Sequence, residues 1–299
     1  MPWKGRAMKR TPRFDLQPDL FIADASFVRS KDLNPFMTTG WFALGKTPRF
    51  EPIIHEHQNY TIKVANTSAD HGIATIWDHD VLIFLFSQII HAHNQGEQTS
   101  ARIRFTGFEY FHFLRRRWSG GNTGQRAYNN LWAGLERLHY TDIHTNIKPH
   151  GDIESGDIKF YWLPHIEKMK VKGRAVGYEV WLDPKIHEWT KDPKNALSLD
   201  SRYFDITSGL DRFLYLWSRK SVGPNHDRGW TERFDLIHEK SGSTTPKRQF
   251  YQMLRKSIKN NNIPGYTLNE VATHRGAELD VVRDIYHDPS NTRELPDGR

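Results

Sequence analysis

The chain has 299 residues, with 42 lysines and arginines against 35 aspartates and glutamates, so its formal net charge at pH 7 is +7. It has no cysteine, which excludes disulfides, thiolate zinc sites, iron–sulfur clusters and cysteine nucleophiles. The basic excess favours a polyanionic partner, either nucleic acid or an anionic membrane surface. The longest apolar run, residues 81–86, is far shorter than the roughly 18 residues of a membrane span. No apolar stretch follows the basic N-terminus, so we expect a cytoplasmic protein with no membrane partner.

The N-terminal part of the chain differs in composition from the rest. Residues 1–13 carry five basic groups and no acid, and the sequence up to residue 55 is rich in proline without a sustained period. We therefore expect residues 1–55 to form an extended basic arm. Two domains should follow, over 56–192 and 193–299, because a polar, proline-containing stretch separates two groups of periodic segments near residue 192.

The first of these domains is predicted to mix helices and short strands. A helix is expected over 77–93, and it is apolar on all sides, which is typical of a buried helix. The other predicted elements, in chain order, are strands at 60–64 and 102–105, a helix from Thr106, a helix over 123–139, strands at 141–147, 158–163, 169–171 and 178–182, and a helix over 183–189.

The second domain is predicted to repeat this order. Thr207, Thr231 and Thr245 are the expected caps of three helices that end near residues 221, 240 and 260, and a hairpin of 266–271 and 278–284 follows. Each domain thus has two helices, a sharp glycine turn, a third helix and a β-hairpin. That order is typical of a winged helix, whose third helix enters the DNA major groove while the hairpin touches the flanking backbone. The expected fold class is α+β, with two tandem winged-helix domains after the arm.

An internal repeat supports this interpretation. One constant separation relates Ser119, Gly120, Thr123, Arg126 and Tyr128 to Ser241, Gly242, Thr245, Arg248 and Phe250. The first helices also align, residues 82–87 with 213–218. Two amphipathic helices often look alike, but apolar spacing alone would not also match the Ser-Gly turn, the threonine and the arginine. The pattern therefore predicts a tandem duplication.

Both third helices have a polar face opposite their apolar face when they are placed on a helical wheel. The predicted DNA-binding residues on these faces are Arg126, Asn130 and Arg137 in the first and Arg248, Gln252, Arg255 and Lys259 in the second. Arg115, Arg116 and Arg117 are added as basic contacts. Residues 245–260 contain no acid, whereas a solvated helix face normally mixes charges. Arginine can form two parallel hydrogen bonds with guanine, and glutamine or asparagine can form two with adenine. A merely solubilising face is the alternative.

Two segments match known catalytic motifs in sequence, but neither has the structural context that the motif requires. Residues 40–47 match the phosphate-binding pattern G-x-x-x-x-G-K-[ST], but Pro48 disfavours the helical conformation at Thr47, and Trp41 is bulky for a loop that wraps phosphate. His91 and His93 could indicate the metal site of a rolling-circle nicking enzyme, yet on a helix they point apart. We therefore expect no enzyme activity, no catalytic residues, no metal and no cofactor.

Several separated blocks of the chain resemble one known family. They lie at residues 71–78, 123–138, 141–147, 207–215 and 238–243, within a resemblance that covers roughly 17–270. The chain is similar to the bacterial plasmid replication initiators called replication initiator protein A, relatives of the TrfA-type initiators. The resemblance implies a protein that binds repeated sequences (iterons) in double-stranded plasmid origin DNA, controls plasmid copy number, opens AT-rich DNA and recruits host replication proteins. It also implies a switch between monomers and homodimers. A winged-helix transcriptional repressor and, less favoured, a metal-dependent nickase are the alternatives.

A short motif in the arm suggests a protein partner. Gln17, Asp19, Leu20 and Phe21 resemble the peptide with which many replication proteins bind the bacterial sliding clamp. An extended segment can present Leu20 and Phe21 to an apolar pocket, and Pro18 lowers the cost of ordering it. Packing of these apolar residues on the first domain is the alternative interpretation.

Overall fold

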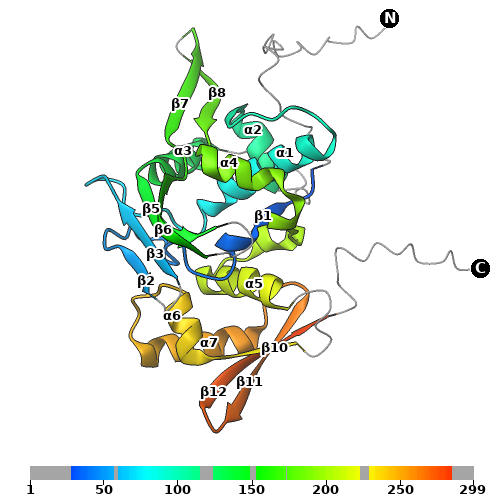
Figure 1. The fold of residues 1–299 in the computed structure, drawn as a ribbon. Coiled ribbons are helices and arrows are strands. Elements are labelled where there is room, and N and C mark those ends of the chain that lie inside the picture. Colours follow the sequence, from blue (N-terminus) through cyan, green and yellow to red (C-terminus); the bar gives the residue numbers. More distant parts are fainter. Residues whose placement is uncertain are drawn as a thin grey trace, which may run out of the picture.

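The structure is a computed structural model that describes residues 28–56, 60–114, 124–148, 153–172, 174–222 and 229–284. It consists of helices and antiparallel sheets arranged in two units (Figure 1). The first unit contains α1 (His79–Asn94), β4 (Arg102–Phe105), α2 (Gly107–Leu114), α3 (Gln125–His139), β7 (His165–Val171) and β8 (Arg174–Trp181). The second contains α5 (Gly209–Ser221), β10 (Trp230–Arg233), α6 (Phe234–Lys240), α7 (Lys247–Asn260), β11 (Tyr266–Thr273) and β12 (Gly276–Arg283).

The two units repeat one order of elements and one sheet topology. In each, the strand that follows the first helix pairs with the last strand of the unit, so the sheets have the orders β4-β8-β7 and β10-β12-β11. The third helices α3 and α7 occupy equivalent places. This correspondence agrees with the tandem repeat predicted from the sequence.

The first unit has an additional sheet. Strands β5 (Thr141–Ile147) and β6 (Ile153–Tyr161) follow α3 and pair with β2 (Ile53–Glu56) and β3 (Thr61–Asn66) in the order β2-β3-β5-β6. The unit ends in α4 (Pro184–Lys191), whose cap is Asp183: its carboxylate accepts a hydrogen bond from the Lys185 amide at 2.9 Å. In Figure 1 the β7–β8 hairpin extends from one end of the molecule and the β11–β12 hairpin from the other.

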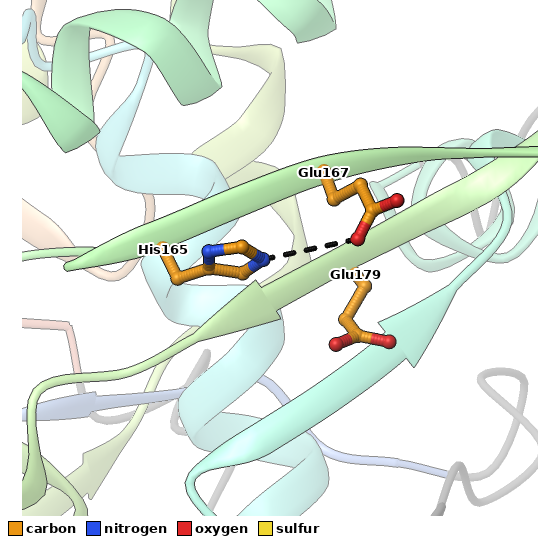
Figure 2. A group of neighbouring side chains, drawn as sticks. All are labelled: His165, Glu167 and Glu179. Carbon is orange, nitrogen blue, oxygen red and sulfur yellow. Dashed lines mark ion pairs between the residues drawn. The ribbon is translucent and has the colours of Figure 1, made fainter.

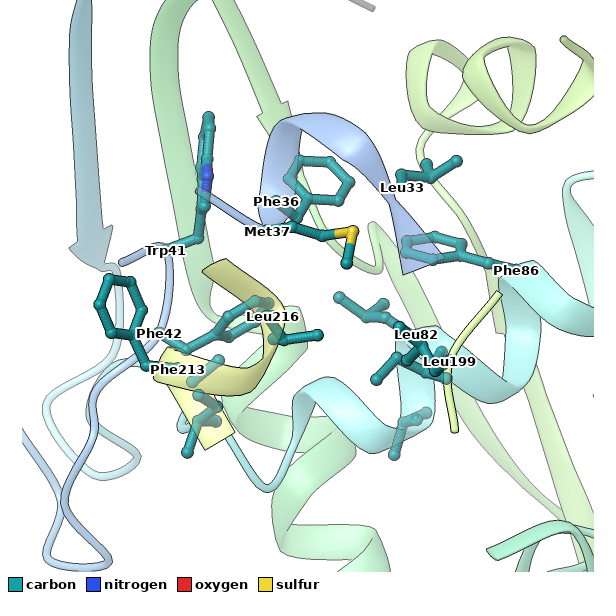
Figure 3. Close-up of a cluster of buried hydrophobic side chains, with 14 of the residues drawn as sticks. Leu33, Phe36, Met37, Trp41, Phe42, Leu82, Phe86, Leu199, Phe213 and Leu216 are labelled. Carbon is teal, nitrogen blue, oxygen red and sulfur yellow. The ribbon is translucent and has the colours of Figure 1, made fainter. Parts of the chain in front are cut away.

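The expected extended arm is wrong from residue 28 onward. Strand β1 (Lys31–Leu33) pairs with β9 (Ala196–Ser198), and the 3-10 turn η1 (Asn34–Phe36) follows. Figure 3 shows this segment between α1 and α5. Phe36 is almost fully buried and stacks on Phe86 of α1, with 6.1 Å between the ring centroids. The irregular spacing of its apolar residues gives no period that sequence analysis could detect, yet each of them packs into the core.

All three helix caps predicted for the second unit are also wrong. Thr231 does not cap a helix but lies in β10 opposite Asp280 of β12. The residue that caps α5 is Ser208 and not Thr207, because the Ser208 hydroxyl accepts a hydrogen bond from the Asp211 amide at 3.2 Å. Helix α7 has Pro246 at its N-cap position and no side-chain cap, so Thr245 does not cap it either.

The second unit is fixed on the first by close contacts. The Gly40 amide donates to the Lys240 carbonyl at 2.5 Å, and Nη1 of Arg49 donates to the Gly242 carbonyl at 2.6 Å. A Cβ atom at Gly40 would lie 2.3 Å from the carbonyl oxygen of Ser241, which leaves no room for a side chain. Gly40, the first glycine of the phosphate-binding pattern, is therefore required for close packing between the two segments. Trp41 and Phe42 beside it are buried, and no helix begins at Thr47.

Candidate nucleic-acid interface

Helix α7 has a more basic surface than α3, the equivalent helix of the first unit. Phe250 and Leu254 are fully buried, which turns Arg248, Gln252 and Lys259 outward into solvent. The predicted outward orientation of these three residues is therefore confirmed. Because no acid lies within α7, the exposed face carries unmixed positive charge.

One cation on this face is held by the hairpin of its own unit. The Nε atom of Arg255 donates to both carboxylate oxygens of Glu270 in β11 at 3.0 Å, and Nη2 donates at 2.8 Å. These hydrogen bonds raise the pKa of Arg255. Half of the arginine side chain is still exposed. The sequence indicated Arg255 but not Glu270, because the two residues lie on different elements and no local pattern connects them.

Helix α3 differs from α7 in how many of its predicted DNA-binding residues are exposed to solvent. Arg126 and Asn130 are exposed as predicted, while Leu131 and Leu135 are buried. Arg137, however, does not extend into solvent: its Nε and Nη2 atoms each donate to Asp78 at 2.7 Å, and its side chain is 22% exposed. The predicted outward orientation of Arg137 is wrong because the start of α1 lies against the last turns of α3.

The same face of α3 borders a groove of about 700 Å³. Arg126, Asn130 and Arg137 line it from α3, and Lys46 and Trp77 line it from the segment before α1. The Lys46 ammonium lies 5.0 Å from the centre of the Trp77 ring. The sequence did not indicate this groove, because its two sides come from segments far apart in the chain.

The hairpins of the two units carry opposite charge. Lys168, Lys170 and Lys172 lie along β7 and its turn, and the last two are exposed. The Lys168 ammonium stands 4.0 Å from the centre of the Trp132 ring, which connects this hairpin to α3. In contrast, the β11–β12 hairpin carries three acids against one arginine near its turn, namely Glu270, Glu278 and Asp280 against Arg275.

Three side chains of the kinds that can bind a metal ion lie at the base of the β7–β8 hairpin. Figure 2 shows His165 and Glu167 on β7 beside Glu179 on β8. The buried Glu179 carboxylate accepts hydrogen bonds from Arg102 at 2.7 and 3.0 Å and a further one from Arg104. Together these arginines lower the pKa of Glu179 from 4.5 to about 2. Since its charge is already balanced by two cations on β4, the cluster forms a cross-strand ion network.

Other predicted site residues lie outside the described residues. These are Arg115, Arg116 and Arg117, and the clamp-like motif of Gln17, Asp19, Leu20 and Phe21. His91 and His93 lie in the last turn of α1, in agreement with the helical placement that argued against a shared metal. Across the ranges that the structure describes, no helix has the length and apolar character needed to cross a membrane.

An exposed, acid-free basic face along a helix, such as that of α7, is typical of a protein that binds nucleic acid. The family comparison agrees with this class: residues 31–268 match the model of replication initiator protein A. The chain therefore belongs to the replication initiator protein A family.

Individual relatives support this assignment. A protein of Wigglesworthia glossinidia brevipalpis named "Putative replication protein" is 30% identical over 220 residues, which cover 72% of this chain and 76% of the relative. Among solved structures, domains 2 and 3 of RctB superpose with TM-scores of 0.57 and 0.52 in two crystal structures. The identities are 14% and 13%, and each match covers 82% of this chain and 95% of the RctB chain, so the likeness is one of fold.

Proposed function

We propose that this replication initiator binds repeated sequences in double-stranded plasmid origin DNA, with α7 as its main reading helix and α3 as its second. The observation that carries the proposal is the exposed, acid-free face of α7, which occupies the same topological position as α3 in a repeated unit. On this basis each unit is a winged helix: its third helix enters the major groove and its hairpin is the wing. Because contacts such as that between Arg49 and Gly242 fix the two units together, the helices would reach successive major grooves, about 34 Å apart.

The two units contribute differently in this proposal. Arg248, Gln252, Arg255 and Lys259 of α7 would read bases and contact phosphates, whereas only Arg126 and Asn130 are exposed among the predicted residues of α3. The first unit compensates through the exposed Lys170 and Lys172 of its hairpin, which suit the phosphate backbone. Phosphates would avoid the acidic hairpin of the second unit except at its turn.

Initiation in this proposal is non-covalent and requires partners. Bound protein would open nearby AT-rich DNA, recruit host replication proteins and limit copy number, and a homodimer would form the non-initiating state. Sedimentation with and without origin DNA tests the dimer. A peptide of residues 14–26, with and without Leu20→Ala and Phe21→Ala, tests binding of the arm to purified sliding clamp.

The experiment that tests the central proposal is footprinting on the DNA that adjoins the coding region. We expect protection of repeated sites, support of replication when the protein is supplied in trans, and no strand nicking of supercoiled plasmid with Mg²⁺ or Mn²⁺. Binding without support of replication would favour the transcriptional repressor. Metal-dependent nicking would favour the nickase and would contradict the non-catalytic mechanism.

A further inference from the structure

The hydrogen bonds of Arg255 occupy only one edge of its guanidinium group. Nε and Nη2 face the Glu270 carboxylate, at 2.8–3.0 Å. Nη1 has no hydrogen-bond partner among the described residues, and half of the side chain is exposed, so the edge formed by Nη1 and Nη2 is available to a ligand. That edge carries two parallel N–H groups, which is the arrangement that binds O6 and N7 of guanine in the major groove.

A second contact restricts the same side chain. The Arg255 guanidinium carbon lies 5.6 Å from the centre of the ring of Phe234, the buried first residue of α6. A cation over an aromatic face is attracted to it. Arg255 is thus held from two sides, by a residue of α6 and a residue of β11, although it lies on the exposed face of α7.

The position of Glu270 follows from the alternation of β11. Tyr266 and Leu268 are buried, and Glu270 is two residues further along the same face of the strand. It lies opposite Leu279 of β12, which is also buried. Glu270 therefore points toward α7 at the place where the apolar contact between hairpin and helix ends, while Asp280 on β12 belongs to the outer face.

We infer that Glu270 is a positioning residue that determines specificity: it holds Arg255 so that the open guanidinium edge reads a guanine. This inference rests on the proposed function. A free arginine loses much rotamer freedom when it binds, and a side chain held in advance loses less. The Glu270 charge also repels phosphate, so the pair disfavours contacts with the DNA backbone and leaves the base contact as the favourable one.

The opposite role for Glu270, a competitor that keeps Arg255 from DNA, predicts the opposite result. The variant Glu270→Gln keeps the shape of the side chain and removes its charge. If Glu270 positions Arg255, affinity for origin DNA falls roughly fivefold to tenfold, and affinity for a scrambled duplex of the same composition stays level or rises. If Glu270 competes, affinity for both duplexes rises, and the inference is overturned.

Fluorescence anisotropy with the two duplexes gives these affinities for the full-length protein. The matched control is Asp280→Asn, which removes one charge from the same hairpin on its other face and should leave the ratio of the two affinities unchanged. Arg255→Ala should lower that ratio at least as far as Glu270→Gln, and the double variant should lower it no further than Arg255→Ala alone. Independent, additive effects would overturn the inference. Thermal unfolding of each variant shows whether the hairpin is intact.

The base itself can be identified by replacing each guanine of the site in turn with 7-deazaguanine, which lacks N7. The parent protein should lose affinity at one guanine at which Arg255→Ala loses none, and Glu270→Gln should show a smaller loss there than the parent. If the parent protein does not distinguish origin DNA from scrambled DNA at all, the proposed function fails as well. If it does and Glu270→Gln distinguishes them equally well, only the present inference fails.

Discussion

The carboxylate of Asp80 and the guanidinium of Arg212 form an ion pair of 2.7 Å that joins the first helix of one unit to the first helix of the other. Both side chains are less than a tenth exposed. Arg212 also donates to the carbonyl of Ile206 at 2.9 Å and lies over the Tyr203 ring, 5.0 Å from its centre. The pair thus connects the two halves of the repeat inside the protein core.

Removal of one partner of this pair should destabilise the whole protein. Arg212→Ala leaves the buried Asp80 charge without compensation, so we expect a loss of about 3–5 kcal/mol in the free energy of unfolding. Chemical denaturation measures it. The control is Lys191→Ala, which breaks the exposed pair with Glu188 and should cost less than about 1 kcal/mol. Equal effects of the two substitutions would contradict a stabilising role of the buried pair.

Two arginines that the helical wheels both place on a polar face should behave differently. Arg248→Ala removes an exposed side chain of α7, so we expect a loss of roughly 1–3 kcal/mol in binding to origin DNA with little change in thermal stability. Arg137→Ala instead removes the ion-pair partner of buried Asp78 and should cost about 3 kcal/mol of stability. Anisotropy and thermal unfolding separate the two effects. Unchanged DNA binding by Arg248→Ala would remove this residue from the reading face.

The basic hairpin of the first unit should act through phosphates. Replacing both Lys170 and Lys172 by alanine should weaken binding to origin and scrambled duplexes by similar factors. It should also reduce the slope of log K against log salt by about 2, because two fewer counterions are released from the DNA. A titration series between 50 and 200 mM salt measures this slope. A selective loss for origin DNA would instead indicate that the hairpin reads sequence.

The cross-strand ion network predicts a specific acid sensitivity. The folded-state pKa of Glu179 is about 2 against an ordinary 4.5, so its charge stabilises the folded protein above pH 4.5. That contribution, about 3 kcal/mol, is lost as the pH falls from 4.5 through about 2. The Glu179→Gln variant should therefore be less stable at pH 7 and should lose less stability on acidification. Parallel pH–stability curves for the variant and the parent would show that Glu179 does not contribute.

Local patterns in the sequence were sufficient for much of the fold. The strand β5 was predicted with its observed bounds, and α1, α3 and the β11–β12 hairpin were placed within a few residues. In each of these, apolar periodicity, turn residues or charge lie within one short segment. The repeat was visible for the same reason, because the turn and helix of one unit recur together in the other. The exposed face of α7 follows from its own helical wheel.

Tertiary structure alone decided which of the predicted groups are available and how the units are joined. Residues 28–43 have no period of their own and were assigned to an arm, but Phe36 and Trp41 complete the core that α1 and α5 share. Arg137 and Asp78 are 59 residues apart, and Arg212 and Asp80 are 132 apart. A charged side chain is free or paired according to what the folded chain brings within hydrogen-bonding distance of it. That distance depends on long-range packing, which periodicity and spacing along one segment do not encode.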